Sequence, residues 1–316
     1  MQEAISYSDG ASAVSSAIPA FSKKGDLLLA DEAVSEPILT GLNLSRSTVQ
    51  FFRHNDMDHL RSILQSIAND DKRLKRDTSQ QRRFIVVEGL YRNTGDICPL
   101  PEILALKEEF FYRVILDESV SFGALGRTGR GVTEHFGVSV SEVEVLLLAM
   151  DTALASVGGV CIGSREIVDH QRLSGAGYCF SASAAPFLSA AACKALQIIE
   201  ESPSLLETLH ANSRYLHKSI VDKVDGLQLR CSVPTPIMHL NLATPLDSLE
   251  EEVAKIMDIS DYCVNHGVGV LASKFSLLNS TSGMKYRPSL TLCASTKLSP
   301  EDMQRVVATL IAASKI

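Results

Sequence analysis

The chain has 316 residues, of which 45% are hydrophobic and 21% are charged, and its formal net charge is −7. This length is enough for one large domain and a smaller one with a sizeable core. The acidic excess argues against a general nucleic-acid-binding role, which depends on clustered Lys and Arg.

The patterns of cysteine, histidine and apolar residues argue against a disulfide-rich, a metal-binding, a secreted and a membrane-spanning protein. Seven cysteines are scattered without a C-x-x-C pair, and the eight histidines show no metal-binding spacing. We therefore expect reduced thiols, a reducing compartment such as the cytosol and no metal site. The polar first residues predict no secretory signal. The most apolar window, Val143 to Gly163, contains Glu144 and Asp151, so we interpret it as buried core and expect no transmembrane segment.

Short apolar runs alternate with helical patterns, which predicts a mainly parallel α/β sheet. The runs interpreted as strands are Asp26–Ala30, Thr48–Phe52, Phe84–Glu88, Arg113–Asp117, Val143–Ala149, Gly158–Ile162 and Tyr178–Ser181. Together they would complete a seven-stranded sheet. Between them, Asn55 is a candidate N-cap for a helix over Asp56–Asn69, and Pro101 suits the first turn of a helix that runs to Phe111.

The segment Asp70–Arg83 reads DDKRLKRDTSQQRR and is almost entirely charged or polar. We interpret it as a solvated surface loop, because most such runs are loops. The alternative is a basic patch for an anionic partner.

The pattern changes after two predicted helices, Pro186–Glu201 and Pro203–Val224. The following strands are predicted at Leu227–Cys231, Pro236–Leu242, Val268–Leu271 and Ser289–Cys293, with helices at Ser248–Asn265 and Pro300–Ala313. These elements predict a small C-terminal α+β domain. We place the large domain at residues 1–202 and the small domain at residues 203–316.

A glycine-rich run, DESVSFGALGRTGRG, extends from Asp117 to Gly131 at the end of a predicted strand. By itself it would be interpreted as a turn. Four more segments accompany it: VVEGLYRNTGDICPLPEILAL (Val86–Leu106), GVTEHFG (Gly131–Gly137), GGVCIG (Gly158–Gly163) and YCFSASAAP (Tyr178–Pro186).

In this order and spacing, the segments resemble the α-oxoamine synthases, which condense an amino acid with an acyl-CoA on pyridoxal phosphate (PLP) with loss of carbon dioxide. Within that family, VVEGLY, GRGVTEH and DHQRLSG are most similar to the long-chain base subunits of serine palmitoyltransferase. The resemblance runs from about Gly10 to the C-terminus. It implies a fold-type-I PLP-transferase large domain, a hetero-oligomer and the cytosolic face of the endoplasmic reticulum membrane.

The chain lacks part of the set of residues that PLP chemistry requires. Catalysis requires a lysine for the Schiff base and a carboxylate that faces the pyridine nitrogen. The resemblance assigns the second, now vestigial, position to Asp117. It assigns the lysine position to Thr152, and no lysine occurs between Lys107 and Lys194. Because a hydroxyl forms no imine, we expect no catalytic residue in this chain.

Three further positions depart from the family pattern. Val120 replaces a histidine after the strand-end carboxylates, and Ser35 replaces the histidine that stacks on the cofactor ring. Thr291 replaces an arginine that holds a substrate carboxylate. His54, in the motif H-N-D, matches the family, but a structural contact at a helix start explains it better.

Active sites in this family use residues of both subunits, so a chain without the lysine can still complete the site of its partner. The interface candidates are Gly129, Arg130 and Gly131, because a fixed arginine suits a phosphate or carboxylate. The alternative is an internal ion pair of Arg130 with Glu134 or Glu118.

The resemblance implies a non-catalytic subunit of serine palmitoyltransferase, which condenses serine with palmitoyl-CoA in the first step of sphingolipid biosynthesis. Its expected partner is the PLP-binding long-chain base subunit 2, which holds the cofactor covalently. Full-length subunits of this type are longer at the N-terminus and carry a membrane-spanning helix there, so this sequence resembles a truncated form. The alternatives are an independent PLP-dependent condensing enzyme and a non-functional truncated isoform.

Overall fold

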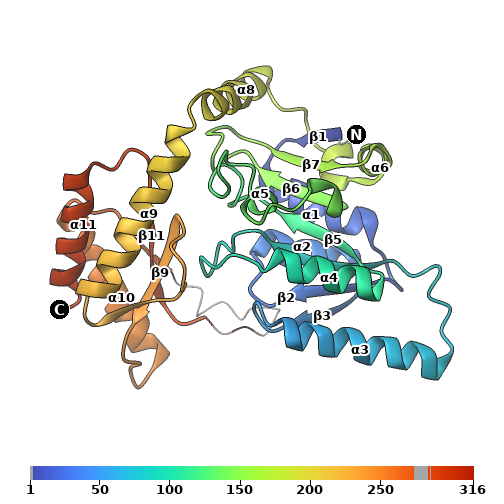
Figure 1. Cartoon of the computed structure of the whole chain (residues 1–316), viewed down its shortest axis with the longest axis horizontal. Helices are drawn as coiled ribbons and strands as arrows, with labels where there is room; N and C mark the ends of the chain where they lie inside the picture. Colours follow the sequence, from blue (N-terminus) through green and yellow to red (C-terminus); the bar gives the residue numbers. More distant parts are fainter. Residues whose placement is uncertain (1–2, 274–283, 285) are drawn as a thin grey trace. The chain divides into compact units, whose positions relative to one another are not determined.

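A computed structural model describes residues 3–273, 284 and 286–316 of the chain (Figure 1). The chain divides into two compact units. The first unit comprises Met1–Tyr91 and Ile97–Pro203, and the second comprises Arg92–Asp96 and Ser204–Ile316. The assignment of residues 1–202 and 203–316 to separate functional domains stays a prediction.

A seven-stranded sheet in the order β1-β7-β6-β5-β4-β2-β3 forms the centre of the first unit. Its strands are β1 (Glu3–Tyr7), β2 (Leu27–Asp31), β3 (Thr48–Phe52), β4 (Arg83–Glu88), β5 (Arg113–Asp117), β6 (Val145–Ala149) and β7 (Gly159–Gly163). Strands β2 to β6 are parallel, and β7 is antiparallel to both of its neighbours. The predicted mainly parallel α/β fold is confirmed.

Helices surround this sheet. They are α1 (Gly10–Phe21), α2 (Glu36–Ser45), α3 (Met57–Leu74), α4 (Leu100–Phe110), α5 (Val132–His135), α6 (Arg165–Ser174), α7 (Ala176–Cys179) and α8 (Pro186–Glu201), with a 3-10 turn η1 (Val140–Glu142). Helix α1 packs on β6, β7 and α2, whereas α3 packs on β3 and α4. Every residue of β2 and β6 is buried, as expected for parallel strands that are covered on both faces.

The seventh strand was predicted at Tyr178–Ser181, and this prediction is wrong. That segment falls on the short helix α7 and the residues after it, and Phe180 is 90% exposed. The edge of the sheet is taken by β1, whose register pairs Glu3 with Gly163 and Tyr7 with Gly159. Aromatic residues favour strands only where a neighbouring strand is available to pair with them.

The predicted loop Asp70–Arg83 and the predicted N-cap Asn55 are also corrected. Helix α3 continues to Leu74, because Lys, Arg and Leu are good helix formers even on a fully polar surface. Its N-cap is Asp56, whose carboxylate accepts a 2.7 Å hydrogen bond from the His59 backbone N–H. Asn55 precedes the cap in a left-handed conformation, with φ of 51°.

The second unit is an antiparallel sheet in the order β10-β11-β9-β8 with helices α9 to α11. Its elements are α9 (Ser204–Lys223), β8 (Leu227–Leu229), β9 (Ile237–Leu242), α10 (Leu249–Asn265), β10 (Leu271–Ser273), β11 (Ser289–Cys293) and α11 (Pro300–Ala313). Its core includes Leu240, Ile256 and Leu310. The strand predicted at Val268–Leu271 begins only at Leu271; the other predicted elements overlap those observed.

The segment Arg92–Asp96 belongs to the second unit because its backbone is bound there. The Thr235 hydroxyl donates a 2.8 Å hydrogen bond to the carbonyl oxygen of Gly95, and the Arg230 guanidinium donates one of 3.0 Å to that of Asn93. An imidazole nitrogen of His239 lies 2.9 Å from the Arg92 carbonyl oxygen. A side chain at Gly95 would collide with the Ile237 carbonyl oxygen at 2.5 Å.

Candidate functional site

The two positions predicted from cofactor chemistry lie on neighbouring strand ends and share one contact residue. Asp117 is the last residue of β5, is buried, and accepts a 2.8 Å hydrogen bond from the Ser119 backbone N–H. Thr152 follows β6, and its hydroxyl donates a 2.6 Å hydrogen bond to the Ser119 carbonyl oxygen. The carboxyl ends of the strands therefore bring Asp117 and Thr152 together, where open α/β sheets bind ligands.

These residues do not fit covalent PLP. The Thr152 side chain has no amine, and its hydroxyl is bound to the backbone. Val120, in the turn after Asp117, is buried and apolar. A carboxylate that could face a pyridine ring is therefore present, but the described residues of this turn offer no group for the imine.

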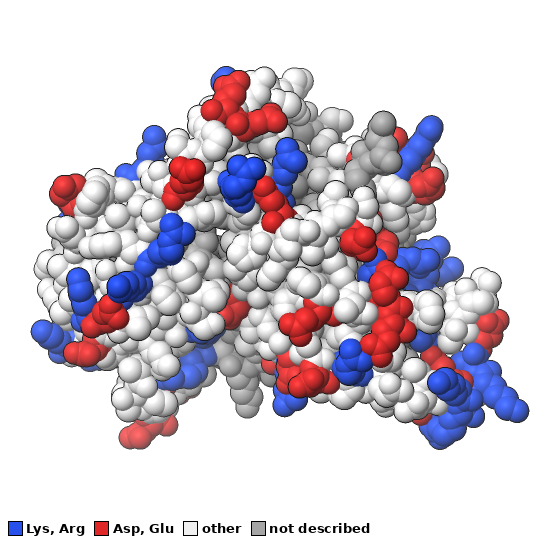
Figure 2. Space-filling model, viewed as in Figure 1, with Lys and Arg blue, Asp and Glu red and all other residues white. Residues whose placement is uncertain are grey.

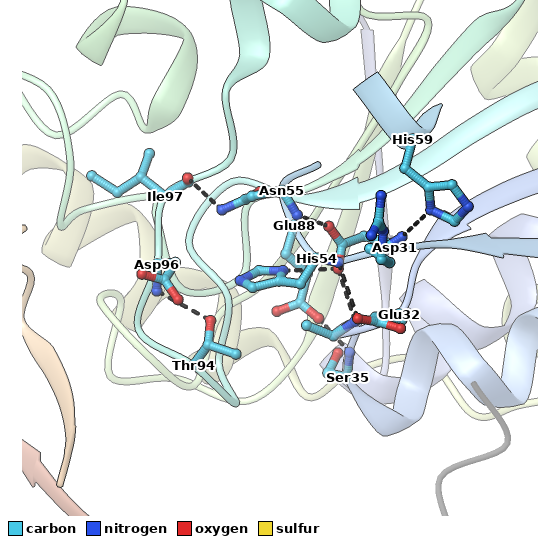
Figure 3. A network of polar contacts seen from close by, with 12 residues as sticks. Asp31, Glu32, Ser35, His54, Asn55, His59, Glu88, Thr94, Asp96 and Ile97 are labelled. Atoms are coloured by element: carbon cyan, nitrogen blue, oxygen red, sulfur yellow. Dashed lines mark hydrogen bonds and ion pairs between the residues drawn. The ribbon is translucent and has the colours of Figure 1, made fainter. Parts of the chain in front are cut away.

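A second polar group lies at the ends of β2 and β4 (Figure 3). The buried Asp31 carboxylate lies 2.9 Å from Nδ1 of His54 and accepts a 2.9 Å hydrogen bond from the Asn55 backbone N–H. The Glu88 carboxylate accepts a hydrogen bond from the Ser35 backbone N–H. These contacts link the segments that follow β2 and β3, which supports a structural role for His54.

Glu118 is a buried anchor of the glycine-rich loop, a structural role that its sequence position did not indicate. Its side chain is 1% exposed, and its carboxylate accepts hydrogen bonds from the Ser121 hydroxyl and, at 3.0 Å, from the Val132 backbone N–H. Burial raises the pKa of Glu118 to about 7, although these hydrogen bonds act in the opposite direction. Glu118 thus anchors the end of the glycine-rich loop from inside the fold.

Gly131 is required beside Glu118 for two reasons. Its φ of 85° lies in the left-handed region, and a Cβ there would lie 2.3 Å from a Glu118 carboxylate oxygen. The sequence offered a signal for this pair, namely a D-E dipeptide at a strand end followed by glycines. From the sequence, Glu118 was predicted only as an alternative ion-pair partner of Arg130.

Glu134 holds the glycine-rich loop from the other side. Its carboxylate accepts hydrogen bonds from the Thr128 backbone N–H at 3.0 Å, the Thr128 hydroxyl at 2.8 Å and the Arg130 backbone N–H at 3.1 Å. Burial alone would raise the pKa of Glu134, but these hydrogen bonds and the Arg130 charge lower it below its ordinary value. Glu134 therefore holds the loop backbone at Thr128 and Arg130, next to the predicted residues Gly129 and Gly131.

The Arg130 side chain is exposed, and it forms no ion pair with the described residues. The carboxylates of Glu118 and Glu134 are engaged by hydroxyl and backbone donors instead. Arg130 borders a hollow of about 460 Å³ that also contacts Leu146, Leu148 and Ile162 of β6 and β7. Its guanidinium is thus available at the edge of an apolar surface.

The glycine-rich loop and the Thr152 loop are in direct contact. A Cβ at Gly123 would lie 2.2 Å from the Cβ of Ala153, the residue after Thr152. The Ser156 hydroxyl continues this contact and donates a 2.8 Å hydrogen bond to the Leu188 carbonyl oxygen in α8. The glycine-rich loop, the loop that carries Thr152 and the start of α8 are therefore packed together in the first unit.

Thr291, the predicted replacement for a substrate-binding arginine, lies in β11 of the second unit. Its hydroxyl is 3.3 Å from Nδ1 of His239. Burial lowers the pKa of His239 to about 4, so this imidazole is neutral at physiological pH. Thr291 and His239 therefore contact each other as two neutral side chains, and neither carries a charge that would hold a carboxylate.

The described residues contain neither a membrane-spanning helix nor a cluster of metal ligands. No helix in residues 3–273, 284 and 286–316 is long and apolar enough to cross a bilayer. No cluster of three His, Cys, Asp or Glu side chains in that part of the chain is placed to hold a metal ion.

Comparison with known proteins gives close relatives over most of the chain. Long chain base biosynthesis protein 1c of Oryza sativa is 46% identical over 279 residues, which cover 88% of this chain and 57% of that protein. Serine palmitoyltransferase 1 of Dictyostelium discoideum is 39% identical over 316 residues, which cover 96% of this chain and 64% of that protein. The chain thus spans less than two thirds of the length of these relatives.

Solved structures share the fold. Serine palmitoyltransferase of Sphingomonas wittichii superposes with a TM-score of 0.82 at 25% identity, over 99% of this chain and 72% of that one. 8-Amino-7-oxononanoate synthase of Francisella tularensis gives a TM-score of 0.79 at 19% identity, over 99% of this chain and 82% of that one. The model of the family "aminotransferase class I and II" matches residues 1–310, and the chain belongs to this family.

Proposed function

We propose that this chain is the non-catalytic subunit of a serine palmitoyltransferase and that it completes the site of a PLP-bearing partner. The observation that carries the proposal is the Thr152 hydroxyl, bound to the Ser119 carbonyl oxygen at the position expected for the Schiff-base lysine. A site that keeps Asp117 and the glycine-rich loop but lacks an amine suits a subunit that acts through another chain.

The identity of the relatives supports the reaction. Two of them are named long chain base biosynthesis protein 1c and serine palmitoyltransferase 1. By this proposal the complex condenses serine with palmitoyl-CoA, and the partner is the long-chain base subunit 2, which binds PLP covalently. The complex resides at the cytosolic face of the endoplasmic reticulum membrane.

Arg130 is the residue that we assign to the partner's site. Its guanidinium carries a fixed charge and a planar set of donors that suit a phosphate or carboxylate. The hydrogen bonds of Glu134 to the loop backbone hold Arg130 at a defined place while its side chain stays exposed. Gly129 and Gly131 adopt left-handed conformations on either side of it, with φ of 82° and 85°.

The test is co-expression of the tagged chain with the PLP-binding long-chain base subunit 2. We expect the two chains to co-purify and the complex to release CoA from palmitoyl-CoA in a serine-dependent reaction. The chain alone should release none. A chain that binds no partner would support the alternative of a non-functional truncated form.

An independent PLP enzyme is the alternative of a different class. Incubation of the purified chain with PLP and borohydride distinguishes it, because borohydride reduces an imine to a stable lysine adduct. Mass spectrometry that locates such an adduct on a lysine of residues 1–202 would overturn the proposed non-catalytic role.

A further inference from the structure

Phe111 stands in an unusual position at the end of α4. It is the C-cap residue with φ of 59° and ψ of 46°, and its side chain is 90% exposed. Helices commonly end on a left-handed residue, but this residue is usually Gly or Asn, and a bulky one is an outlier. The backbone of Phe111 closes α4, because its N–H donates a hydrogen bond to the Lys107 carbonyl oxygen. The exposed ring, however, packs in no core of the chain, and a smaller residue would close the helix at a lower conformational cost.

Two hollows of the first unit flank Phe111, and each is lined by several cations and by two carboxylates. The first, of about 780 Å³, is lined by Phe111 together with Lys72, Lys75 and Arg76. The second, of about 620 Å³, is lined by Phe111 together with Lys23, Arg82 and Arg113. An exposed aromatic ring therefore stands between two groups of basic side chains.

Four of these cations, Lys23, Lys72, Lys75 and Arg113, form no ion pair with the described residues. The four carboxylates that line the two hollows are already engaged, and one of them, Glu144, lies 2.9 Å from the Lys107 amine. Asp71 pairs with Arg76 at 3.3 Å and with Arg83 at 2.6 Å, Glu109 pairs with Arg61 at 2.7 Å, and Glu108 lies 3.4 Å from Lys107. The space-filling view shows a concentration of blue atoms over the far end of α3 (Figure 2).

The chain as a whole has a net charge of −7, so a local group of unpaired cations is a departure from its average surface. The last residue of α3, Leu74, lies in sequence between these lysines and is 50% exposed. An exposed Phe and Leu among lysines and arginines is the composition of segments that rest in the headgroup region of anionic membranes.

We propose that this region, which we call the Phe111 surface (Phe111, Leu74, Lys72, Lys75 and Arg113), binds the surface of an anionic lipid bilayer. The Phe111 ring enters the boundary between headgroups and acyl chains, and the cations lie against the phosphate and carboxylate groups of the lipids. A soluble acidic partner would also attract the cations, but it would not need an aromatic ring held in a left-handed conformation. The inference gives the proposed membrane location a contact surface and does not depend on the role of the chain in catalysis.

The test is co-sedimentation of the whole chain with vesicles that contain about one-third phosphatidylserine in phosphatidylcholine. Phe111→Asn keeps a residue that tolerates the left-handed conformation, so it removes the ring without disturbing the helix end. Phe180→Asn is its matched control, because Phe180 is also 90% exposed but does not line either of the two hollows. Lys72→Gln/Lys75→Gln removes two cations, and Lys218→Gln/Lys223→Gln is the control on α9.

We expect the wild-type chain to bind these vesicles and to leave pure phosphatidylcholine vesicles unbound. Phe111→Asn should weaken the partition about tenfold, from the loss of a partly buried ring, and the double lysine variant about 30-fold, at roughly fivefold per cation. Both control variants should bind as the wild type does. Equal binding by Phe111→Asn and the wild type, equal effects of the control variants, or absence of binding would overturn the proposal. None of these results depends on the partner subunit or on turnover.

Discussion

The Thr152 hydroxyl donates a 2.6 Å hydrogen bond to the carbonyl oxygen of Ser119, whose own N–H donates a 2.8 Å hydrogen bond to the Asp117 carboxylate. One peptide segment thus connects the position of the expected lysine with that of the expected pyridine-facing carboxylate. The hydroxyl is used to hold the turn after β5 against the loop after β6. The turn after β5 and the loop after β6 are therefore bound to each other as one packed structural element.

Restoration of the amine alone should not restore activity. Thr152→Lys supplies an amine but removes the hydrogen bond to Ser119, and Val120 and Ser35 remain without the imidazoles that the family uses. Because catalytic groups act as a unit, we expect no serine-dependent CoA release by the variant without a partner. The wild-type heterodimer serves as the positive control. Clear turnover by the variant alone would show that the other losses matter little.

Arg130→Ala should reduce the turnover of the assembled heterodimer without lowering its thermal stability. The exposed guanidinium forms no ion pair with the described residues, so its removal breaks no ion pair among them and only weakens the Coulombic attraction to Glu134. Loss of a charged hydrogen-bond partner in another site costs about 1.5–3 kcal/mol, which predicts a ten- to hundredfold lower turnover. Arg127→Ala is the matched control, since Arg127 is exposed on the same loop.

Both quantities should be measured on one preparation. A lower melting temperature with unchanged turnover per complex would favour the internal ion pair. Equal turnover of Arg130→Ala and Arg127→Ala would remove Arg130 from the partner's site.

The stability of the chain should contain a pH-dependent contribution from Glu118. Its pKa is about 7 in the folded chain and 4.5 in a model compound, so the folded state binds the proton more tightly. This contribution is fully present below pH 4.5 and is lost as the pH rises through 7. The difference between these two pKa values corresponds to ~3 kcal/mol of unfolding free energy.

Glu118→Gln keeps the shape of the side chain and stays uncharged at every pH. The variant should therefore not lose stability as the pH rises through 7. Denaturant unfolding at pH 5 and at pH 8 measures this pH dependence, because pH 5 lies between the two pKa values, 4.5 and about 7, and pH 8 lies above both. We expect the variant to gain stability relative to the wild type on going to the higher pH. A constant difference between variant and wild type would show that Glu118 ionises in the fold as it does in water.

The crowding of Gly131 can be separated from its left-handed conformation. Gly131 and Gly137 both have positive φ, 85° and 67°, but a Cβ at Gly137 meets no atom within 4 Å. Gly137→Ala should therefore cost about 1 kcal/mol of unfolding free energy from conformation alone. Gly131→Ala should cost roughly 3 kcal/mol or more, because its Cβ would overlap the Glu118 carboxylate. Similar losses in the two variants would contradict the close contact.

Leu147→Asp should abolish folding and not only activity. Leu147 is 0% exposed at the centre of β6, where it is paired with Asp117 of β5 and Cys161 of β7. An unpaired carboxylate there costs several kcal/mol. Val157→Asp is the control, because Val157 is apolar but 51% exposed. A soluble Leu147→Asp chain with unchanged melting would contradict the central place of this strand.

Local patterns were sufficient for much of the fold. The strands Thr48–Phe52 and Arg113–Asp117 and the helices Pro186–Glu201 and Pro300–Ala313 were predicted with their observed bounds. In each case the apolar run and its boundary residues lie within a few positions of one another. Asp117, Thr152 and Arg130 were also proposed from sequence, because the spacing of glycines and carboxylates resembles that of a known family.

Other features depended on contacts between segments far apart in the chain. The last strand of the sheet is β1 and not Tyr178–Ser181, since an edge position is decided by which segment reaches the free hydrogen-bonding groups of β7. The hold of Glu118 on Val132 and the contact of Gly123 with Ala153 likewise require the folded backbone. The sequence alone determined that this chain lacks the amine for covalent PLP between Lys107 and Lys194, because the absence of a functional group is a property of composition. Only the tertiary structure decided that the Thr152 hydroxyl is bound to Ser119 and that the Arg130 side chain is left exposed, because the partner of a polar group is set by packing between distant segments.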